Sequence, residues 1–135
     1  MYDKIKKKLR KLLKHWGLGE AEADVFATLA MSDGLTAKDI ANELGYAYST
    51  TINCLNNLMR MGYVERDKKD RKFVYFANTN FVKFVDDEIK KIKTSLKEIA
   101  KEIYRGGYKE KLRNLAIKIE NAIKYLESKK DKVGG

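Results

Sequence analysis

The stretch Gly45–Glu65, GYAYSTTINCLNNLMRMGYVE, decides how this sequence should fold. From Ser49 to Asn57, six of nine residues are Ser, Thr or Asn, which are mediocre helix formers because their side chains compete for backbone hydrogen bonds. Leu55 and Leu58 nevertheless stand at helical spacing within it. The pattern predicts a helix over about 47–61 with one apolar stripe and one side of short, neutral hydrogen-bonding groups.

Three more helical segments are predicted before this one. Apolar residues at helical spacing, with lysines on the other side, indicate a basic helix over 5–16, and a second helix is expected over 20–31. Thr36 is a favourable N-cap for a third helix, which Gly45 should end. The third helix and the helix over 47–61 would then form a helix-turn-helix.

The periodicity changes after Gly62. The runs YVERD and KFVYFAN are rich in β-branched and aromatic residues, and the charged stretch KKDRK joins them. This composition predicts a β-hairpin over 65–77 with a charged tip. Helices followed by such a hairpin are the order of a winged helix-turn-helix, whose recognition helix enters the major groove of DNA. We therefore expect a mainly α fold with one small β-hairpin.

The helical period returns from Phe81 in two heptad seams, Val85–Ile103 and Tyr108–Leu126, on either side of a Gly-Gly pair. Two helices of similar length predict an antiparallel helical hairpin, with one bent coiled-coil arm as the alternative. The expected organisation is a winged-helix domain with a basic N-terminal helix (1–79), a coiled-coil dimerisation segment (80–128) and a frayed tail (129–135).

The charge distribution favours an anionic partner. The formal net charge is +10, yet residues 16–64 carry six acidic and only two basic side chains, while 1–15 carry seven basic and one acidic. Nucleic acid is the favoured partner, although a Lys-rich solvated surface would also account for the charge. Because 16–64 is net negative, phosphate affinity should come from the hairpin, Lys38 and the basic terminal segments.

Other classes of protein fit this sequence poorly. No apolar run approaches the roughly 20 residues that span a bilayer. Cys54 is the only cysteine and His15 the only histidine, which disfavours a disulfide framework and a zinc site, and we interpret Cys54 as a half-buried filler. Since no catalytic constellation can be assembled, we expect a cytoplasmic, DNA-associated protein that is not an enzyme and has no cofactor or evident small-molecule effector.

The groove-facing side of the predicted helix is short and polar. At about 100° per residue, Ser49, Thr50, Asn53 and Asn57 point away from the apolar stripe. Asn can pair bidentately with adenine, while Ser and Thr bond to bases or phosphates. A helix that was merely solvated would be expected to carry Lys and Glu on this side.

Residues 16–77 resemble the winged-helix domain of archaeal TrmB-type and MarR-type transcriptional regulators. The resemblance rests on GLGEAE, LTAKDIANELG, Ser49-Thr50 at the head of the helix and LNNLMRMGYVER. It implies a dimeric DNA-binding regulator in which Tyr48 to Thr50 and Asn53 face the groove and the wing is basic. Tyr48 stands where a basic residue is usual, and Gly19 replaces a Ser cap. The overall size is closer to small Lrs-like chromatin regulators, so the resemblance does not imply sugar sensing.

We therefore predict a homodimeric, sequence-preferring transcription regulator that binds double-stranded DNA and no membrane. The alternative is a protein-interaction or chromatin-organising scaffold of low sequence specificity. The candidate DNA-contacting residues are Thr36, Lys38, Tyr48, Ser49, Thr50, Asn53, Asn57, Lys68, Lys69, Arg71 and Lys72. The candidate dimerisation residues are Leu9, Leu12, Val85, Ile89, Ile92, Leu96, Ile99, Ile103, Leu112, Leu115, Ile119 and Leu126.

Overall fold

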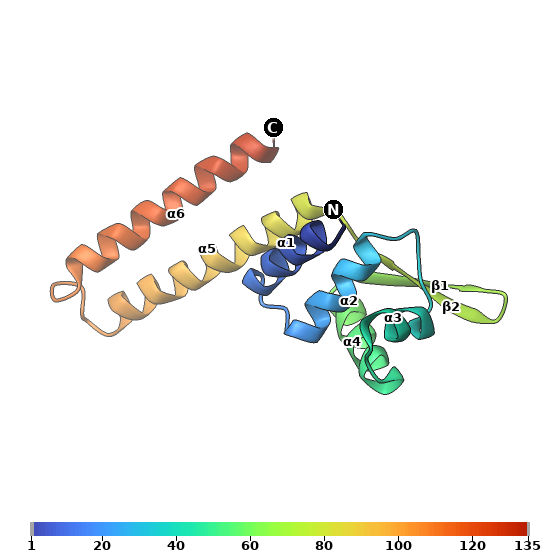
Figure 1. Ribbon diagram of the computed structural model, residues 1–135. Helices are drawn as coiled ribbons and strands as arrows, with labels where there is room; N and C mark the ends of the chain where they lie inside the picture. Colours follow the sequence, from blue (N-terminus) through green and yellow to red (C-terminus); the bar gives the residue numbers. More distant parts are fainter. Residues whose placement is uncertain (1, 135) are drawn as a thin grey trace. The chain divides into compact units, whose positions relative to one another are not determined.

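The computed structural model describes the backbone of residues 2–134 and the side chains of residues 2–129. The chain divides into two compact units, Met1–Thr79 and Asn80–Gly135. Along the described chain (Figure 1) the elements are α1 (Tyr2–His15), α2 (Glu20–Ala30), α3 (Ala37–Leu44), α4 (Tyr48–Arg60), β1 (Val64–Lys69), β2 (Lys72–Ala77), α5 (Phe81–Arg105) and α6 (Arg113–Gly134).

Helix α2 is the centre of the first unit. Residues 23–29 are all buried, and α2 contacts α1, α3, α4 and β2. Leu13 of α1, Ile40 of α3 and Leu55 of α4 are fully buried as well. Each surrounding helix thus contributes one apolar side to a single core, which fixes α3 and α4 relative to each other.

Local signals set the ends of α3 as the sequence predicts. The Oγ1 atom of Thr36 accepts a hydrogen bond from the backbone N–H of Asp39 at 3.1 Å. Gly45 ends the helix with φ of +71°, in the left-handed region that favours glycine. The chain therefore turns sharply into α4, and the predicted helix-turn-helix is confirmed.

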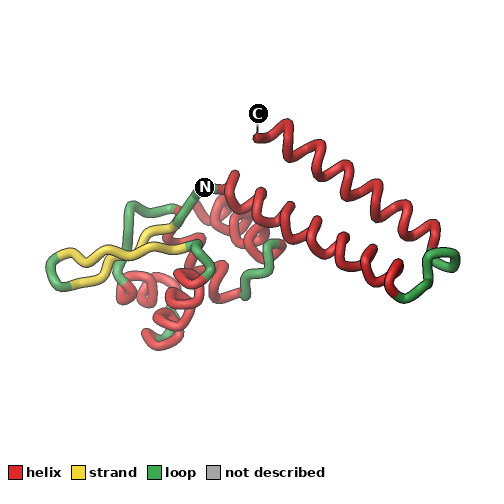
Figure 2. The backbone as a smooth tube through the Cα atoms, turned by 180° about the vertical axis from the view of Figure 1, so that it is seen from behind, coloured by secondary structure: helices red, strands yellow, loops and turns green. Residues whose placement is uncertain are grey.

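Strands β1 and β2 form an antiparallel hairpin, the wing, whose tip projects from the unit (Figure 2). Lys69 pairs with Lys72, so Asp70 and Arg71 make a two-residue turn. Their φ values of 50° and 69° are both positive, as a type I′ turn requires. Two lysines in direct register and an arginine at positive φ both oppose stability. The residues at the tip are therefore not those that would best stabilise this turn.

The base of the wing is tied to the segment before α3. Leu35 and Tyr75 exchange two backbone hydrogen bonds, with N···O distances of 2.8 and 3.1 Å. Gly34 has φ of +123°, and a Cβ there would lie 2.5 Å from the ring of Phe76. The close approach of this glycine to Phe76 therefore holds β2 against the start of the helix-turn-helix.

The second unit is an antiparallel helical hairpin, so the bent-arm alternative is wrong. Ala100 and Ile103 of α5 and Ala116 and Ile119 of α6 form its buried cluster, with Leu96, Leu112 and Ile123 packed against it. Two boundaries differ from the expectation. Tyr108 and Leu112 precede α6, which begins at Arg113. The Tyr108 N–H bonds to the carbonyl of Ile103 at 3.1 Å and so completes the end of α5. Helix α6 continues to Gly134, through most of the expected tail.

Candidate nucleic-acid interface

Helix α4 presents a polar side to solvent. Ser49, Thr50 and Asn53 are exposed, as predicted, whereas Leu55 and Leu58 on the opposite side are fully buried. This division follows from packing against α2 and α3. Because these side chains are short, they project little from α4, and the helix can approach a partner surface closely.

The structure adds Asn56 to this side, which the sequence analysis missed. Asn56 is exposed, three residues after Asn53 and seven after Ser49, while Asn57 is half-buried. Helical periodicity alone puts both asparagines in the polar half of α4. The spacing of Ser49, Asn53 and Asn56 aligns these three side chains on α4, and in the structure Asn56 is the more exposed of the two neighbouring asparagines.

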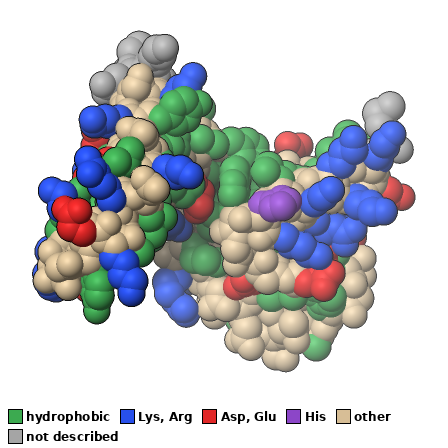
Figure 3. All heavy atoms as spheres, turned by 90° about the vertical axis from the view of Figure 1, so that its left-hand side faces the viewer, with side chains coloured by type: hydrophobic (Ala, Val, Ile, Leu, Met, Phe, Trp, Pro, Cys, Tyr) green, Lys and Arg blue, Asp and Glu red, His purple; other side chains and the backbone are tan. Residues whose placement is uncertain are grey.

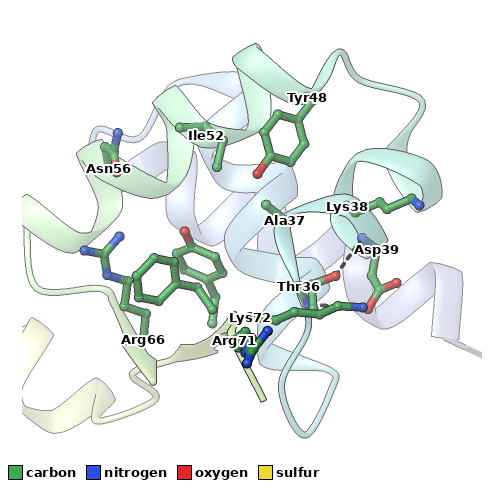
Figure 4. Close-up of a pocket in the computed structure, with 12 residues that line it drawn as sticks. Thr36, Ala37, Lys38, Asp39, Tyr48, Ile52, Asn56, Arg66, Arg71 and Lys72 are labelled. Atoms are coloured by element: carbon green, nitrogen blue, oxygen red, sulfur yellow. Dashed lines mark hydrogen bonds between the residues drawn. The ribbon is translucent and has the colours of Figure 1, made fainter. Parts of the chain in front are cut away.

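A groove of about 730 Å³ lies between α4, the N-terminus of α3 and the wing, and we term it the α4–wing groove. Figure 4 shows side chains from α4 and from the wing on its two sides, with the start of α3 at one end. Its lining residues are Thr36, Ala37, Lys38, Asp39, Tyr48, Ile52, Asn56, Arg66, Arg71, Lys72, Phe73 and Tyr75. The predicted residues Thr36, Lys38 and Tyr48 therefore share one surface with two of the wing cations.

Arg66 is a second lining residue that the sequence analysis missed. Its guanidinium carbon lies 4.1 Å from the centroid of the Phe73 ring. Such stacking restricts a planar guanidinium without consuming its hydrogen-bond donors. The alternation of side chains along a strand was the sequence signal for this contact. Phe73 pairs with Lys68 across the hairpin, and Arg66, two residues before Lys68, lies on the same side of the hairpin as both.

The predicted wing cations do not all lie at the groove. Arg71 and Lys72 line it. The Nζ atom of Lys69 instead lies 5.4 Å from the centroid of the Phe76 ring, on the side of the hairpin opposite Lys68 by strand alternation. The wing therefore carries positive charge on both of its sides.

The acidic start of α2, unexpected in a phosphate binder, is partly neutralised by α1. Arg10 Nη1 lies 2.8 Å from Asp24 Oδ1, and Lys14 Nζ lies 2.9 Å from Glu20 Oε1. The Tyr46 hydroxyl, in the turn before α4, donates to Asp24 Oδ2. Asp24 therefore links α1 to the turn before α4, through Arg10 of α1 and Tyr46 of the turn.

These contacts set the protonation of the Asp24 cluster. Burial alone would raise the pKa of Asp24, but the hydrogen bonds from Tyr46 and Arg10 outweigh it and lower that pKa below its ordinary value. The hydrogen bond to Asp24, together with burial, raises the pKa of Tyr46 to about 12. At neutral pH the cluster is thus an Asp24 carboxylate held by a neutral tyrosine and a cationic arginine.

Cys54 lies on the buried side of α4, and burial raises the pKa of its thiol. A protonated, buried thiol is a poor nucleophile, in agreement with the interpretation of Cys54 as a filler. Among the described residues, no group of three or more His, Cys, Asp or Glu side chains could hold a metal ion. Within the same part of the chain, no helix is long and apolar enough to cross a membrane.

The predicted dimerisation residues of the second unit divide into two groups. Leu96, Ile103, Leu112 and Ile119 pack within the α5–α6 hairpin, while Ile89 and Leu126 are half-buried. Val85, Ile92, Ile99 and Leu115 remain 45–48% exposed. In the first unit, Leu9 is half-buried and Leu12 is 41% exposed.

Comparison with known families identifies the first unit. Residues 13–80 match the family described as "Sugar-specific transcriptional regulator TrmB". The chain belongs to the TrmB family. The match covers the helix-turn-helix, the wing and the end of α1, so this chain is a TrmB-family transcription regulator of the winged-helix type. No curated protein matches it significantly.

Solved structures support the same fold for this TrmB-family chain. A crystal structure described only as a transcriptional regulator matches 98% of this chain and 95% of its own length, at 14% identity and a TM-score of 0.64. TrmBL2, an archaeal chromatin protein, matches 82% of this chain at 23% identity and a TM-score of 0.64, although the match spans 42% of TrmBL2. The ST1889 protein of the archaeon Sulfolobus tokodaii is 19% identical over 62% of this chain and 85% of its own, with a TM-score of 0.51.

Proposed function

We propose that this TrmB-family regulator binds double-stranded DNA through its first unit, residues 1–79, with α4 in the major groove and the wing on the phosphate backbone. The observation that carries the proposal is the exposed line Ser49, Asn53 and Asn56 beside a groove lined by wing cations. Neutral hydrogen-bonding groups suit base edges, while Arg and Lys suit phosphates. The function is that of a non-catalytic, DNA-associated regulator in the cytoplasm.

The groove supplies both kinds of contact at once. Asn53 and Asn56 can each offer an amide donor and acceptor to one adenine. Arg66, stacked on Phe73, presents a pre-oriented guanidinium from the facing wing. We infer that α4 supplies sequence preference and that the wing supplies most of the salt-dependent affinity.

We also propose that the second unit joins two copies of the chain. Val85, Ile92 and Ile99 recur every seven residues and remain exposed, although the hairpin core is already formed by other positions. A continuous apolar stripe of this kind is the seam of a coiled-coil pair. Changing Ile92 and Ile99 to Asp should give a folded monomer by sedimentation equilibrium, while wild type at micromolar concentration sediments as a dimer. A monomeric wild type would contradict the proposal.

The test of DNA recognition compares two asparagines. A preferred duplex is first selected from a random pool by the full chain. Asn53→Ala should then weaken binding to that duplex by roughly 1–3 kcal/mol and weaken binding to random DNA much less. Asn121→Ala, the same change at an exposed position of α6, should alter neither affinity.

Two results would contradict this part of the proposal. Equal losses on both duplexes would make Asn53 a positioning contact and favour binding of low sequence specificity. No loss on either duplex would mean that the polar side of α4 faces solvent, which would favour a scaffold function. All measurements use one fixed salt concentration, since phosphate contacts make affinity strongly salt-dependent.

A further inference from the structure

Helix α1 carries a row of basic side chains outside the α4–wing groove. Lys4, Lys7, Lys8 and Lys11 are all exposed, and we term these four residues the lysine stripe. Their spacing of three and four residues places them on one side of the helix. Figure 3 shows basic side chains gathered beside the single histidine, His15, which ends α1. None of the residues that line the groove belongs to α1.

The stripe lies beside two basic residues of α1 that do have acidic partners. Arg10 and Lys14, on the flank of α1 nearest α2, pair with Asp24 and Glu20. On the second unit, Lys91 and Lys97 pair with acidic residues. Among the residues that the structure describes, no salt bridge involves a member of the stripe. The stripe is thus a local excess of unneutralised positive charge.

This arrangement weakens α1 by itself. Lys4 lies four residues before Lys8, and Lys7 four before Lys11, which are the spacings at which like charges repel most directly on a helix. Asp3 is the one acidic residue of α1. A helix selected only for solubility would alternate lysine with glutamate. An anionic partner along the stripe would remove the repulsion.

The orientation of α1 favours nucleic acid over a membrane as that partner. An interfacial helix inserts its apolar side into lipid. In α1 the apolar side packs on the protein core through the fully buried Leu13, while Ile5 and Leu12 are 50% and 41% exposed, and the lysines point outward. From Lys4 to Lys11 the helix rises about 10 Å, a length over which duplex DNA presents about six phosphates.

We propose that the lysine stripe of α1 is a second DNA-contacting surface, which binds the phosphate backbone of a duplex segment other than the one held in the α4–wing groove. The inference rests on the proposed function, because it concerns a second contact with the same class of partner. The contact made by the lysine stripe carries no base selectivity, since lysine is a point charge on a flexible stem. A chain with both surfaces would connect two duplex segments.

The test uses the full chain with two sets of substitutions. The stripe variant changes Lys4, Lys7, Lys8 and Lys11 to Gln, and a matched control changes four exposed lysines of α5 and α6 to Gln: Lys90, Lys101, Lys118 and Lys124. Affinity for a random-sequence duplex is measured by fluorescence anisotropy over a range of KCl concentrations. The stripe variant should flatten the slope of log K against log salt by up to about 0.9 per lost phosphate contact, and the control should flatten it less.

A second measurement detects directly whether the protein connects two DNA duplexes. Wild type should carry a fluorescent duplex onto beads that hold a different, biotinylated duplex, and the stripe variant should lose most of this capture. Its melting temperature should stay equal or rise, because the repulsion within α1 is removed, so unfolding would not explain the loss. Equal slopes and equal capture for the stripe variant and its control would overturn the proposal. Stripe-dependent binding to phosphatidylglycerol vesicles without a change in DNA affinity would overturn it in favour of a membrane.

A wing variant, in which Lys68, Lys69, Arg71 and Lys72 are changed to Ala, separates this inference from the proposed function. If the wing variant binds DNA as wild type does, the assignment of the wing to the phosphate backbone fails. The comparison of the stripe variant with its control remains decisive in that case. If the wing variant loses affinity and adding the stripe substitutions changes nothing more, the stripe proposal alone fails.

Discussion

The cluster of Asp24, Tyr46 and Arg10 gives a quantitative prediction for the stability of the first unit. The rise of the Tyr46 pKa from 10.0 to about 12 corresponds to roughly 2.7 kcal/mol of preference for the neutral hydroxyl beside the carboxylate. A hydrogen bond to a charged group contributes about 1.5–3 kcal/mol. Tyr46→Phe and Asp24→Asn should each lower the free energy of unfolding by about 2 kcal/mol. The double variant should lose far less than the sum.

Urea unfolding of the four proteins, followed by the fluorescence of Trp16 in the first unit, completes the double-mutant cycle. Arg10→Gln should cost less than about 1 kcal/mol, because the Arg10 side chain is 37% exposed and solvent screens its ion pair. Glu20→Gln is the matched control, since both members of the Lys14–Glu20 pair are well exposed. A coupling energy between Asp24 and Tyr46 below about 0.5 kcal/mol would refute the reasoning.

The pH dependence has a defined sign. The folded-state pKa of Asp24 is lowered, so its contribution is complete above the unfolded pKa of about 4 and is lost as pH falls through the lower folded value. The folded-state pKa of Tyr46 is raised, so its contribution is complete below pH 10 and is lost as pH rises through about 12. The stability difference between wild type and Tyr46→Phe should therefore stay constant from pH 5 to 9.

Two further predictions concern the wing. Gly34→Ala should lower the free energy of unfolding by roughly 1–3 kcal/mol, because its Cβ would meet the Phe76 ring at 2.5 Å; an unchanged urea midpoint would contradict this. Replacing Asp70-Arg71 by Asn-Gly should raise the free energy of unfolding by about 1 kcal/mol, because it relieves an arginine at positive φ, and should weaken DNA binding through the loss of Arg71. Asp70→Asn alone should leave DNA affinity intact, and equal DNA affinity of both variants would show that Arg71 makes no contact.

Elements with strong local signals could be predicted from the sequence. Thr36 and Gly45 fix the ends of α3 because their caps are made by neighbouring residues. The division of α4 into a polar and an apolar side followed from periodicity alone. Asn56 was missed although its spacing from Ser49 and Asn53 was the available signal; the partial burial of Asn57, in contrast, depends on the packing of neighbouring elements.

The heptad seam of α5 shows the same limit. The sequence pattern treats Val85, Ile92, Leu96, Ile99 and Ile103 as one apolar stripe. In the structure only part of that stripe packs within the hairpin, since α6 covers Leu96 and Ile103 and leaves the other three exposed. A single periodic pattern cannot state which partner covers each residue. Long-range placement, here of α6, decides it.

The net charge of the chain is a poor guide to where DNA would lie, and the structure gives a physical reason. The acidic residues that make 16–64 net negative include Asp24 and Glu20, which α1 already engages through Arg10 and Lys14. Without these two pairs, residues 16–64 still carry four acidic side chains against two basic ones, while exposed cations gather on the wing and on the lysine stripe and neutral Ser and Asn side chains lie on α4. Because charge and base-matching groups occupy different elements, changes in the wing should alter the salt dependence of binding, while changes in α4 should alter sequence preference. A wing variant that changed base preference at constant salt slope would show that this division of roles is wrong.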